Sequence, residues 1–137
     1  MSKIEGGCLC GAVTYHSECE PHATVVCHCR DCQKHSGAAC SINIMLPREG
    51  FSVNGEVSSY AGCGDSGHEV RRYFCKTCGS LLYNMPALIS DMCVLKAGTL
   101  NDPSWVKPTM EIYCDSAQDW AKLGGEVSSL PGMIPSQ

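Results

Sequence analysis

At 137 residues the chain is long enough for one domain with a modest hydrophobic core. Hydrophobic residues make up 44% and charged residues 18%, which excludes a disordered chain, and no apolar run approaches the ~20 residues of a membrane span. The formal charge of −4 disfavours nucleic-acid binding through a basic surface. Residues 1–5 lead into the first cysteines without the apolar segment of a signal peptide, so we expect a soluble cytoplasmic protein.

Short strands dominate the predicted secondary structure. Segments in which β-branched and aromatic residues alternate with polar ones are separated by Gly, Pro and Asn. Asn54-Gly55 predicts a hairpin turn between the two strands that flank it. The predicted strands, in chain order, cover residues 11–15, 24–26, 40–46, 51–53, 57–60, 69–74, 80–83, 92–97 and 110–113.

Two short helices are predicted beside these strands. The first covers residues 30–36 and ends at Gly37, a suitable C-cap. The second covers residues 116–123, with Ser116 as its N-cap. The pattern as a whole predicts a mainly β domain of short sheets.

Seven of the 12 cysteines fall into three tight clusters. A tetrahedral zinc with Zn–S bonds of ~2.3 Å holds its sulfurs ~3.8 Å apart, and both C-x-x-C turns and extended C-x-C segments bring two sulfurs this close. Four thiolates close a structural site, whereas three protein ligands with an open fourth position are typical of a catalytic zinc. The predicted structural set is Cys8, Cys10, Cys75 and Cys78, and the predicted catalytic set is Cys27, Cys29 and Cys32.

Other interpretations of these clusters stay open. Disulfides explain many cysteine-rich small domains, but C-x-C spacing suits cross-linking poorly because neighbouring bridges would crowd one another. The middle cluster could also close its own tetrahedron with His28 or His35, although His28 points away from its flanking cysteines if the C-x-C is extended. A zinc clip between residues 8 and 78 would tie the N-terminal segment to the centre of the chain.

The remaining polar and thiol groups are interpreted more simply. Since seven thiolates subtract seven charges and two Zn²⁺ add four, the formal charge falls from −4 to −7 in the zinc-bound protein. The basic pairs Arg71-Arg72 and Arg30 with Lys34 are interpreted as solvated surface charges. Five cysteines stand outside the clusters and are expected to be inert, with Cys63 expected in an exposed loop: Cys19, Cys40, Cys63, Cys93 and Cys114.

Three segments resemble a known family. They are Gly6-Gly-Cys-Leu-Cys-Gly-Ala-Val-Thr-Tyr15, Cys27-His-Cys-Arg-Asp-Cys-Gln-Lys-His-Ser-Gly-Ala38 and Arg72-Tyr-Phe-Cys-Lys-Thr-Cys-Gly-Ser-Leu-Leu82. They are similar to the glutathione-dependent formaldehyde-activating enzymes, a family that includes the centromere-protein-V-like domains. The resemblance extends over residues 5–133 as a single zinc-binding domain.

The resemblance implies an Mss4-like fold of several small coiled antiparallel sheets around a structural zinc. It implies one zinc on Cys8, Cys10, Cys75 and Cys78, and a second, labile zinc on Cys27, Cys29 and Cys32 where glutathione binds. The implied activity is that of a carbon–sulfur lyase that joins or splits glutathione and formaldehyde. The chemistry suits the cluster, since a metal lowers the pKa of an entering thiol and yields a thiolate at neutral pH.

The sequence departs from the family at Glu111-Ile-Tyr113, where the family often has His-Ile-aromatic. His35, about one turn beyond Cys32, is a candidate acid or base, although an exposed histidine is the simpler interpretation. Two function classes are retained. The first is a zinc-dependent lyase acting on a small thiol and a small aldehyde, as a monomer or homodimer, with no nucleic-acid or membrane partner. The alternative is a non-catalytic zinc domain that binds a protein partner.

Overall fold

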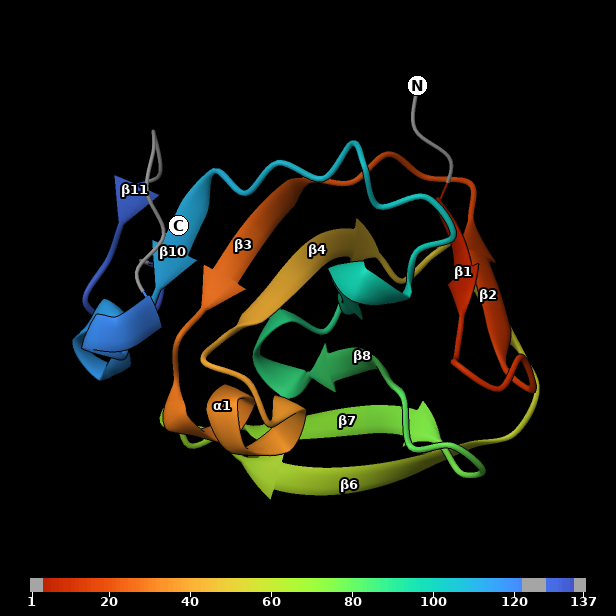
Figure 1. The fold of residues 1–137 in the computed structure, drawn as a ribbon, viewed down its shortest axis with the longest axis horizontal. Coiled ribbons are helices and arrows are strands. Elements are labelled where there is room, and N and C mark those ends of the chain that lie inside the picture. Colours follow the sequence, from red (N-terminus) through yellow and green to blue (C-terminus); the bar gives the residue numbers. More distant parts are fainter. Residues whose placement is uncertain (1–3, 122–127, 135–137) are drawn as a thin grey trace.

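Two β-sheets form the framework of the protein. The computed structural model describes residues 4–121 and 128–134 (Figure 1). One sheet has three strands in the order β1-β2-β5, and the other has eight in the order β11-β10-β3-β4-β9-β8-β7-β6. The strands are β1 (Ile4–Gly7), β2 (Thr14–Ser17), β3 (Ala23–Cys27), β4 (Ser41–Pro47), β5 (Phe51–Asn54), β6 (Val57–Cys63), β7 (Glu69–Cys75), β8 (Leu81–Pro86), β9 (Met92–Lys96), β10 (Met110–Ile112) and β11 (Ser128–Ser129).

The mainly β fold expected from the sequence is confirmed. Each predicted strand has a counterpart within a few residues, and most pairings are antiparallel. The first predicted strand starts later than expected, because Gly11 lies in a turn with φ +82 and pairing begins only at Thr14. β1 and β11 were not predicted from the sequence.

The predicted hairpin at Asn54-Gly55 is wrong. β5 pairs with β2 and β6 pairs with β7, so the two segments belong to different sheets. Gly55 has φ +104, and a Cβ built on it would lie 2.2 Å from the Ala12 carbonyl oxygen. The chain therefore uses this glycine to leave one sheet for the other while passing close to the backbone of residues 12 and 13.

β10 places a late segment of the chain beside an early one. It pairs in parallel with β3, with Ile112 opposite Cys27, and in parallel with β11. These parallel pairs differ from the antiparallel pairing expected for the family. They bring Ile112 and Tyr113 close to the end of β3, where the middle cysteine cluster begins.

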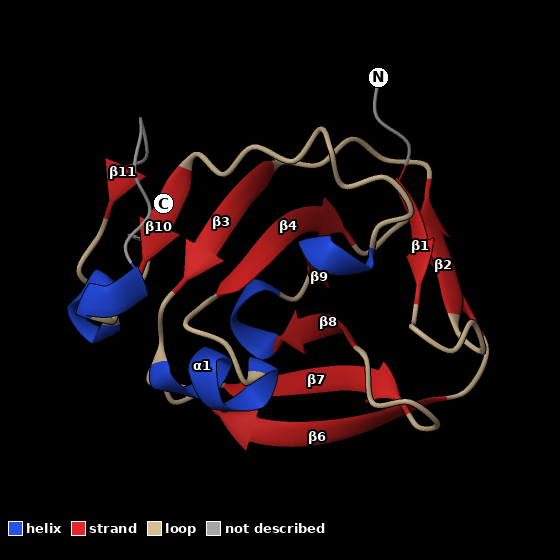
Figure 2. Cartoon of the chain, in the orientation of Figure 1, coloured by secondary structure: helices blue, strands red, loops and turns tan. Residues whose placement is uncertain are grey.

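The predicted helix at residues 30–36 is confirmed as α1 (Arg30–Ser36). Its N-cap is Cys29, whose sulfur accepts a hydrogen bond from the Cys32 backbone N–H, and its C-cap Gly37 has φ 69. The predicted helix at 116–123 is wrong over its described part: two 3₁₀ turns, Cys114–Ser116 and Asp119–Ala121, are separated by an extended Ala117 (Figure 2). Residues 122 and 123 lie outside the described residues.

Two further 3₁₀ turns, Ala87–Ile89 and Ala97–Thr99, flank β9. None of the helices in the described ranges is both long and apolar enough to cross a membrane.

The two faces of the eight-stranded sheet differ in character, because successive side chains of a strand point to opposite faces. One face packs its apolar residues against the three-stranded sheet, and burying each large aliphatic side chain contributes about 1.5–3 kcal/mol to this core. The core includes Ile44, Leu46, Cys93 and Leu95 from the large sheet and Ile4 and Tyr15 from the small one. The alternate residues of β4 and β9 are Asn43, Met45, Val94 and Lys96, and they face the other way.

Candidate active site and metal centres

The first candidate metal centre joins two distant parts of the chain. Cys8 and Cys10 follow β1, Cys75 ends β7, and Cys78 lies in the turn before β8. All four sulfurs lie within 4.8 Å of one another. The Cys8–Cys10 and Cys10–Cys75 Sγ–Sγ distances are 3.6 and 3.8 Å, close to the ~3.8 Å that a tetrahedral zinc requires.

Hydrogen-bond donors surround these sulfurs as they would surround thiolates. The Val13 N–H donates to Cys8 Sγ at 3.2 Å, and the Cys78 N–H donates to Cys75 Sγ at 3.4 Å. The Ser80 hydroxyl lies 3.2 Å from Cys78 Sγ, and together with the Ser80 backbone N–H it lowers the pKa of Cys78 to about 5. The pKa of Cys10, by contrast, is raised to about 11, because a lowering hydrogen bond from the Ala12 backbone is outweighed by the neighbouring Cys8 thiol together with desolvation and the Cys78 thiol. Donors that favour anionic sulfur at Cys78 fit a zinc ion.

The second candidate centre is built from one short stretch. Cys27 ends β3, Cys29 caps α1 and Cys32 lies in the first helical turn. Their three sulfurs lie within 4.8 Å of one another, and Cys27 and Cys32 are buried. Hydrogen bonds from the Cys27 and Cys29 thiols lower the pKa of Cys32, and the charge of Lys96 lowers it further. A buried thiolate flanked by two more thiols also fits a thiophilic metal.

Neither histidine completes this second centre. His28 is buried, and its Nε2 lies 2.8 Å from Glu111 Oε1, in a separate group with Cys114. His35 is half-buried on α1, where burial lowers its pKa and the charge of Arg72 lowers it further. Among the described residues, neither ring joins the three sulfurs in one group within 4.8 Å.

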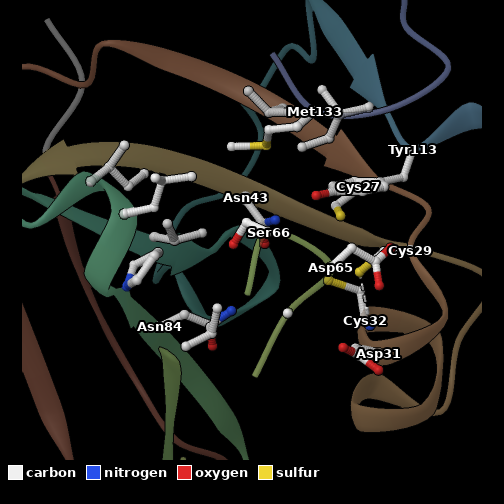
Figure 3. Close-up of a pocket in the computed structure, with 18 of the residues that line it drawn as sticks. Cys27, Cys29, Asp31, Cys32, Asn43, Asp65, Ser66, Asn84, Tyr113 and Met133 are labelled. Carbon is white, nitrogen blue, oxygen red and sulfur yellow. Dashed lines mark hydrogen bonds between the residues drawn. The ribbon is translucent and has the colours of Figure 1, made fainter. Parts of the chain in front are cut away.

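A cavity of about 260 Å³ opens beside the three-cysteine centre (Figure 3). Cys27, Cys29 and Cys32 all line it, and none of the other four clustered cysteines does. In Figure 3 the three sulfurs lie together at one side, and Asn84 lies at the other. The apolar part of the wall consists of Val25, Met45, Val70, Leu88, Ile89, Val94, Ile112, Met133 and Ile134.

Polar side chains from the large sheet also reach the cavity. Arg72 and Asn84 line it, and each keeps a buried polar atom, Nε and Oδ1 respectively, without a hydrogen-bond partner. Asn43 also lines it, and its Oδ1 accepts a hydrogen bond of 2.9 Å from the buried Lys96 Nζ. Two buried basic residues, Arg72 and Lys96, therefore lie on the face of the large sheet that is next to the three-cysteine centre.

Arg72 corrects one expectation from the sequence. The pair Arg71-Arg72 was interpreted as solvated charge, but Arg72 is only 7% exposed. Strand alternation was the available signal, because two consecutive residues of a strand must point to opposite faces. Arg30 and Lys34 are exposed as expected, and the Arg30 guanidinium donates to the Gln33 side-chain oxygen at the cavity rim.

The five remaining cysteines do not form a further cluster with one another. Cys93 is buried in the core and Cys63 is exposed, while Cys19, Cys40 and Cys114 are half-buried. Cys114 is not isolated as expected, since its sulfur lies with His28 and Glu111 within 4.8 Å. Sequence reasoning missed Glu111 as a partner of His28, although its place in a segment where the family often has histidine marked it as unusual.

The fold and the clusters define a mainly β protein with two sets of cysteines that could each hold a metal ion. Comparison with known families shows that the chain belongs to the glutathione-dependent formaldehyde-activating enzyme family, whose model matches residues 3–116.

The chain is also similar to two further proteins, one in sequence and one in fold. An uncharacterized lyase of Schizosaccharomyces pombe is 31% identical over 83 residues, which are 61% of this chain. The chain spans 58% of the length of that relative. A Rhodobacter sphaeroides protein of known crystal structure has the same fold, with a TM-score of 0.59 at 21% identity, over 77% of this chain and 92% of the other.

Proposed function

We propose that this protein is a zinc-dependent carbon–sulfur lyase that joins or splits a small thiol, such as glutathione, and a small aldehyde, such as formaldehyde. The observation that carries the proposal is the position of Cys27, Cys29 and Cys32, which are at once a set that could hold a metal ion and part of a cavity wall. Membership of the family and the lyase relative support a lyase-type activity.

The two cysteine sets are assigned different roles in this proposal. Cys8, Cys10, Cys75 and Cys78 would supply four ligands and hold a structural zinc. Cys27, Cys29 and Cys32 would supply three, and hold a second, labile zinc. When bound there, zinc would favour the thiolate form of a substrate thiol at neutral pH.

The reaction needs no oxidant or reductant. The substrate sulfur attacks the aldehyde carbon, a carbon–sulfur bond forms, and the carbonyl π pair moves to oxygen. The proton lost by the thiol is taken up at this oxygen, so thiol and aldehyde give a hydroxyalkyl thioether, and the reverse sequence splits it. The cavity contributes by holding the two reactants side by side in a mostly apolar space from which much of the water is excluded.

The buried cation Lys96 adds an electrostatic contribution. Its charge favours the ionised form of Cys32. Burial lowers the pKa of Lys96, and the charges of Cys32 and Cys27 offset part of that lowering. Lys96 is held in place by Asn43. These residues would keep Cys32 anionic and ready for a metal. We also place the protein in the cytoplasm, where its 12 free cysteines would stay reduced.

The proposal is tested by measuring how fast ¹³C-formaldehyde exchanges with its glutathione adduct, using NMR exchange spectroscopy on the zinc-loaded protein. We expect exchange above the uncatalysed rate, lost in Cys29→Ala and retained in the control Cys40→Ala, which alters a cysteine outside the clusters. Exchange at the uncatalysed rate with wild type would reject the activity on this pair and favour the partner-binding alternative.

A further inference from the structure

A buried cation faces the cavity, and no carboxylate of the described residues forms an ion pair with it. Arg72 lies on β7, is 7% exposed, and its Nε has no hydrogen-bond partner. The carboxylates within ion-pair distance of basic groups pair elsewhere, as Glu69 does with Arg71 and Glu56 with Lys76. A buried charge without a partner is strongly unfavourable, so the geometry suggests that a ligand completes the environment of Arg72.

The second buried cation is already engaged. Lys96 donates to Asn43 Oδ1 at 2.9 Å. Lys96 does not line the cavity, whereas Arg72 does. Arg72 is therefore the buried cation that is available to bind a ligand in the cavity.

Asn84 lies directly across from Arg72. The two residues are register partners of β7 and β8, so both side chains project from the same face of the sheet. Asn84 Oδ1 is also buried and without a partner. Its amide offers both an acceptor and two donors, and it can turn either end toward a ligand beside the guanidinium.

The same cavity connects this pair to the three-cysteine centre. The row of register partners continues from Asn84 to Val94 and Met45, which give the cavity an apolar floor. A single water needs only about 10–15 Å³ of such space, so a cavity of about 260 Å³ accommodates much more than a one-carbon aldehyde. One ligand could place sulfur or aldehyde carbon at the cysteines and a polar group at Arg72.

We propose that Arg72, with Asn84 beside it, binds a carboxylate of the substrate that reacts at the three-cysteine centre. This inference rests on the proposed function and names the substrate class of the same site. A carboxylate fits better than a phosphate dianion, because one guanidinium balances one charge and Asp31, Asp65 and Glu69 line the same cavity. Arg72 is thus a specificity-determining residue, and the preferred thiol or aldehyde is an acid.

The test separates carboxylate binding from the chemistry at sulfur. Zinc-loaded protein is titrated by calorimetry with S-methylglutathione, which has no free thiol, and with its diethyl ester, which has no carboxylate. In wild type the acid should bind roughly tenfold to a hundredfold more tightly than the ester, as expected for a charge-assisted hydrogen bond. This comparison needs no variant and is unaffected by any folding defect.

The matched variants are Arg72→Gln and Arg71→Gln, the same change on neighbouring residues of one strand. Arg71 donates to Ser59 Oγ at 3.1 Å and its side chain is 39% exposed. Arg72→Gln should remove the preference for the acid and leave ester binding unchanged, whereas Arg71→Gln should bind as wild type does. Circular dichroism and thermal unfolding check that both variants fold.

A parallel titration with glyoxylate shows which reactant carries the acid. A loss on Arg72→Gln for S-methylglutathione assigns the carboxylate to the thiol, and a loss for glyoxylate alone assigns it to the aldehyde. Equal binding of acid and ester in wild type, with no loss of glyoxylate binding in Arg72→Gln, would overturn the inference. Because formaldehyde exchange is measured separately on wild type, this failure is distinct from failure of the proposed activity.

Discussion

The two cysteine centres differ in how the chain builds them. The four-cysteine centre joins sulfurs that are 65 residues apart in sequence, as between Cys10 and Cys75, so it forms only when both sheets are in place. The three-cysteine centre comes from the six residues from Cys27 to Cys32, and its geometry is set by the end of one strand and the start of one helix. We therefore expect the long-range centre to support the fold and the local cluster at the cavity to take part in the chemistry.

The groups that surround the sulfurs also differ between the two centres. The sulfurs of the four-cysteine centre accept hydrogen bonds from backbone N–H groups and lie near the Ser80 hydroxyl. The three-cysteine centre is influenced by the buried charge of Lys96 and shares its cavity with Arg72. Among the described residues, the buried arginine and lysine are Arg72 and Lys96, and both lie on the side of the three-cysteine centre.

The largest expected effect on stability comes from breaking the clip. Cys75→Ser should leave the protein unfolded or strongly destabilised, because structural zinc supplies about 10 kcal/mol or more in small zinc domains. Cys63→Ser, at an exposed cysteine outside both centres, is the control and should unfold like wild type. Thermal unfolding with and without a strong chelator measures both. A Cys75→Ser protein as heat-stable as wild type would show that the four cysteines are not one site.

A smaller loss of stability should follow from crowding residues 12 and 13, which lie beside the four-cysteine centre. Gly55→Ala adds a Cβ 2.2 Å from the Ala12 carbonyl oxygen at φ +104, next to Val13, which hydrogen-bonds Cys8. Gly67→Ala has a similar positive φ of +82 but open space around it. In both variants backbone strain should lower the free energy of unfolding by about 1–2 kcal/mol. Only Gly55→Ala should lose more than this, because only its Cβ meets the backbone of Ala12. Equal unfolding free energies from urea titration would contradict the close approach.

Removing a buried polar pair beside the three-cysteine centre should lower the free energy of unfolding by a smaller amount. Glu111→Ala removes the partner of the buried His28 and of the Ser129 hydroxyl, and unpaired buried groups typically cost about 1–3 kcal/mol. Glu56→Ala breaks an exposed ion pair with Lys76 and should cost below about 1 kcal/mol. Urea unfolding of the two variants gives the difference. A loss no larger for Glu111→Ala than for Glu56→Ala would mean that the His28–Glu111 pair does not hold this part of the fold.

The smallest effect on stability should come from the three-cysteine centre itself. Cys29→Ala should bind one zinc ion fewer than wild type, as measured by metal analysis, while Cys40→Ala should bind as many as wild type. After mild chelation of the labile zinc, Cys29→Ala and wild type should unfold within about 1 kcal/mol of each other, the contribution of an N-cap. Unfolding of Cys29→Ala under these conditions would remove the distinction between the two centres.

Much of this arrangement follows from local sequence. Cysteine spacing specified the three-cysteine cluster and each half of the four-cysteine one, because C-x-C and C-x-x-C bring sulfurs together locally. That the two halves meet was inferred from the four ligands that a closed zinc site needs. The helix at 30–36 was predictable for the same reason, since its cap and its terminal glycine lie within it. Strand positions followed from alternation, which the pleat imposes residue by residue.

What could not be predicted depends on partners distant in sequence. Asn54-Gly55 is a typical hairpin turn, and nothing local reveals that β2 is available to pair with β5. The parallel contact of β10 with β3 is equally invisible from either segment alone. The pairing of Arg72 with Asn84 at the cavity depends on the register of β7 and β8, which only the folded sheet determines.

The separation of 65 residues between Cys10 and Cys75 also has a consequence in time. At about 5–20 residues per second, a ribosome needs roughly 3–13 s to make the chain between them. Throughout that interval Cys75 and Cys78 do not yet exist, so Cys8 and Cys10 cannot form a four-cysteine site with them. The six residues from Cys27 to Cys32 emerge in roughly a second or less at the same speed. During synthesis, the set of sulfurs that is completed first is therefore the one on which we expect the finished fold to depend least.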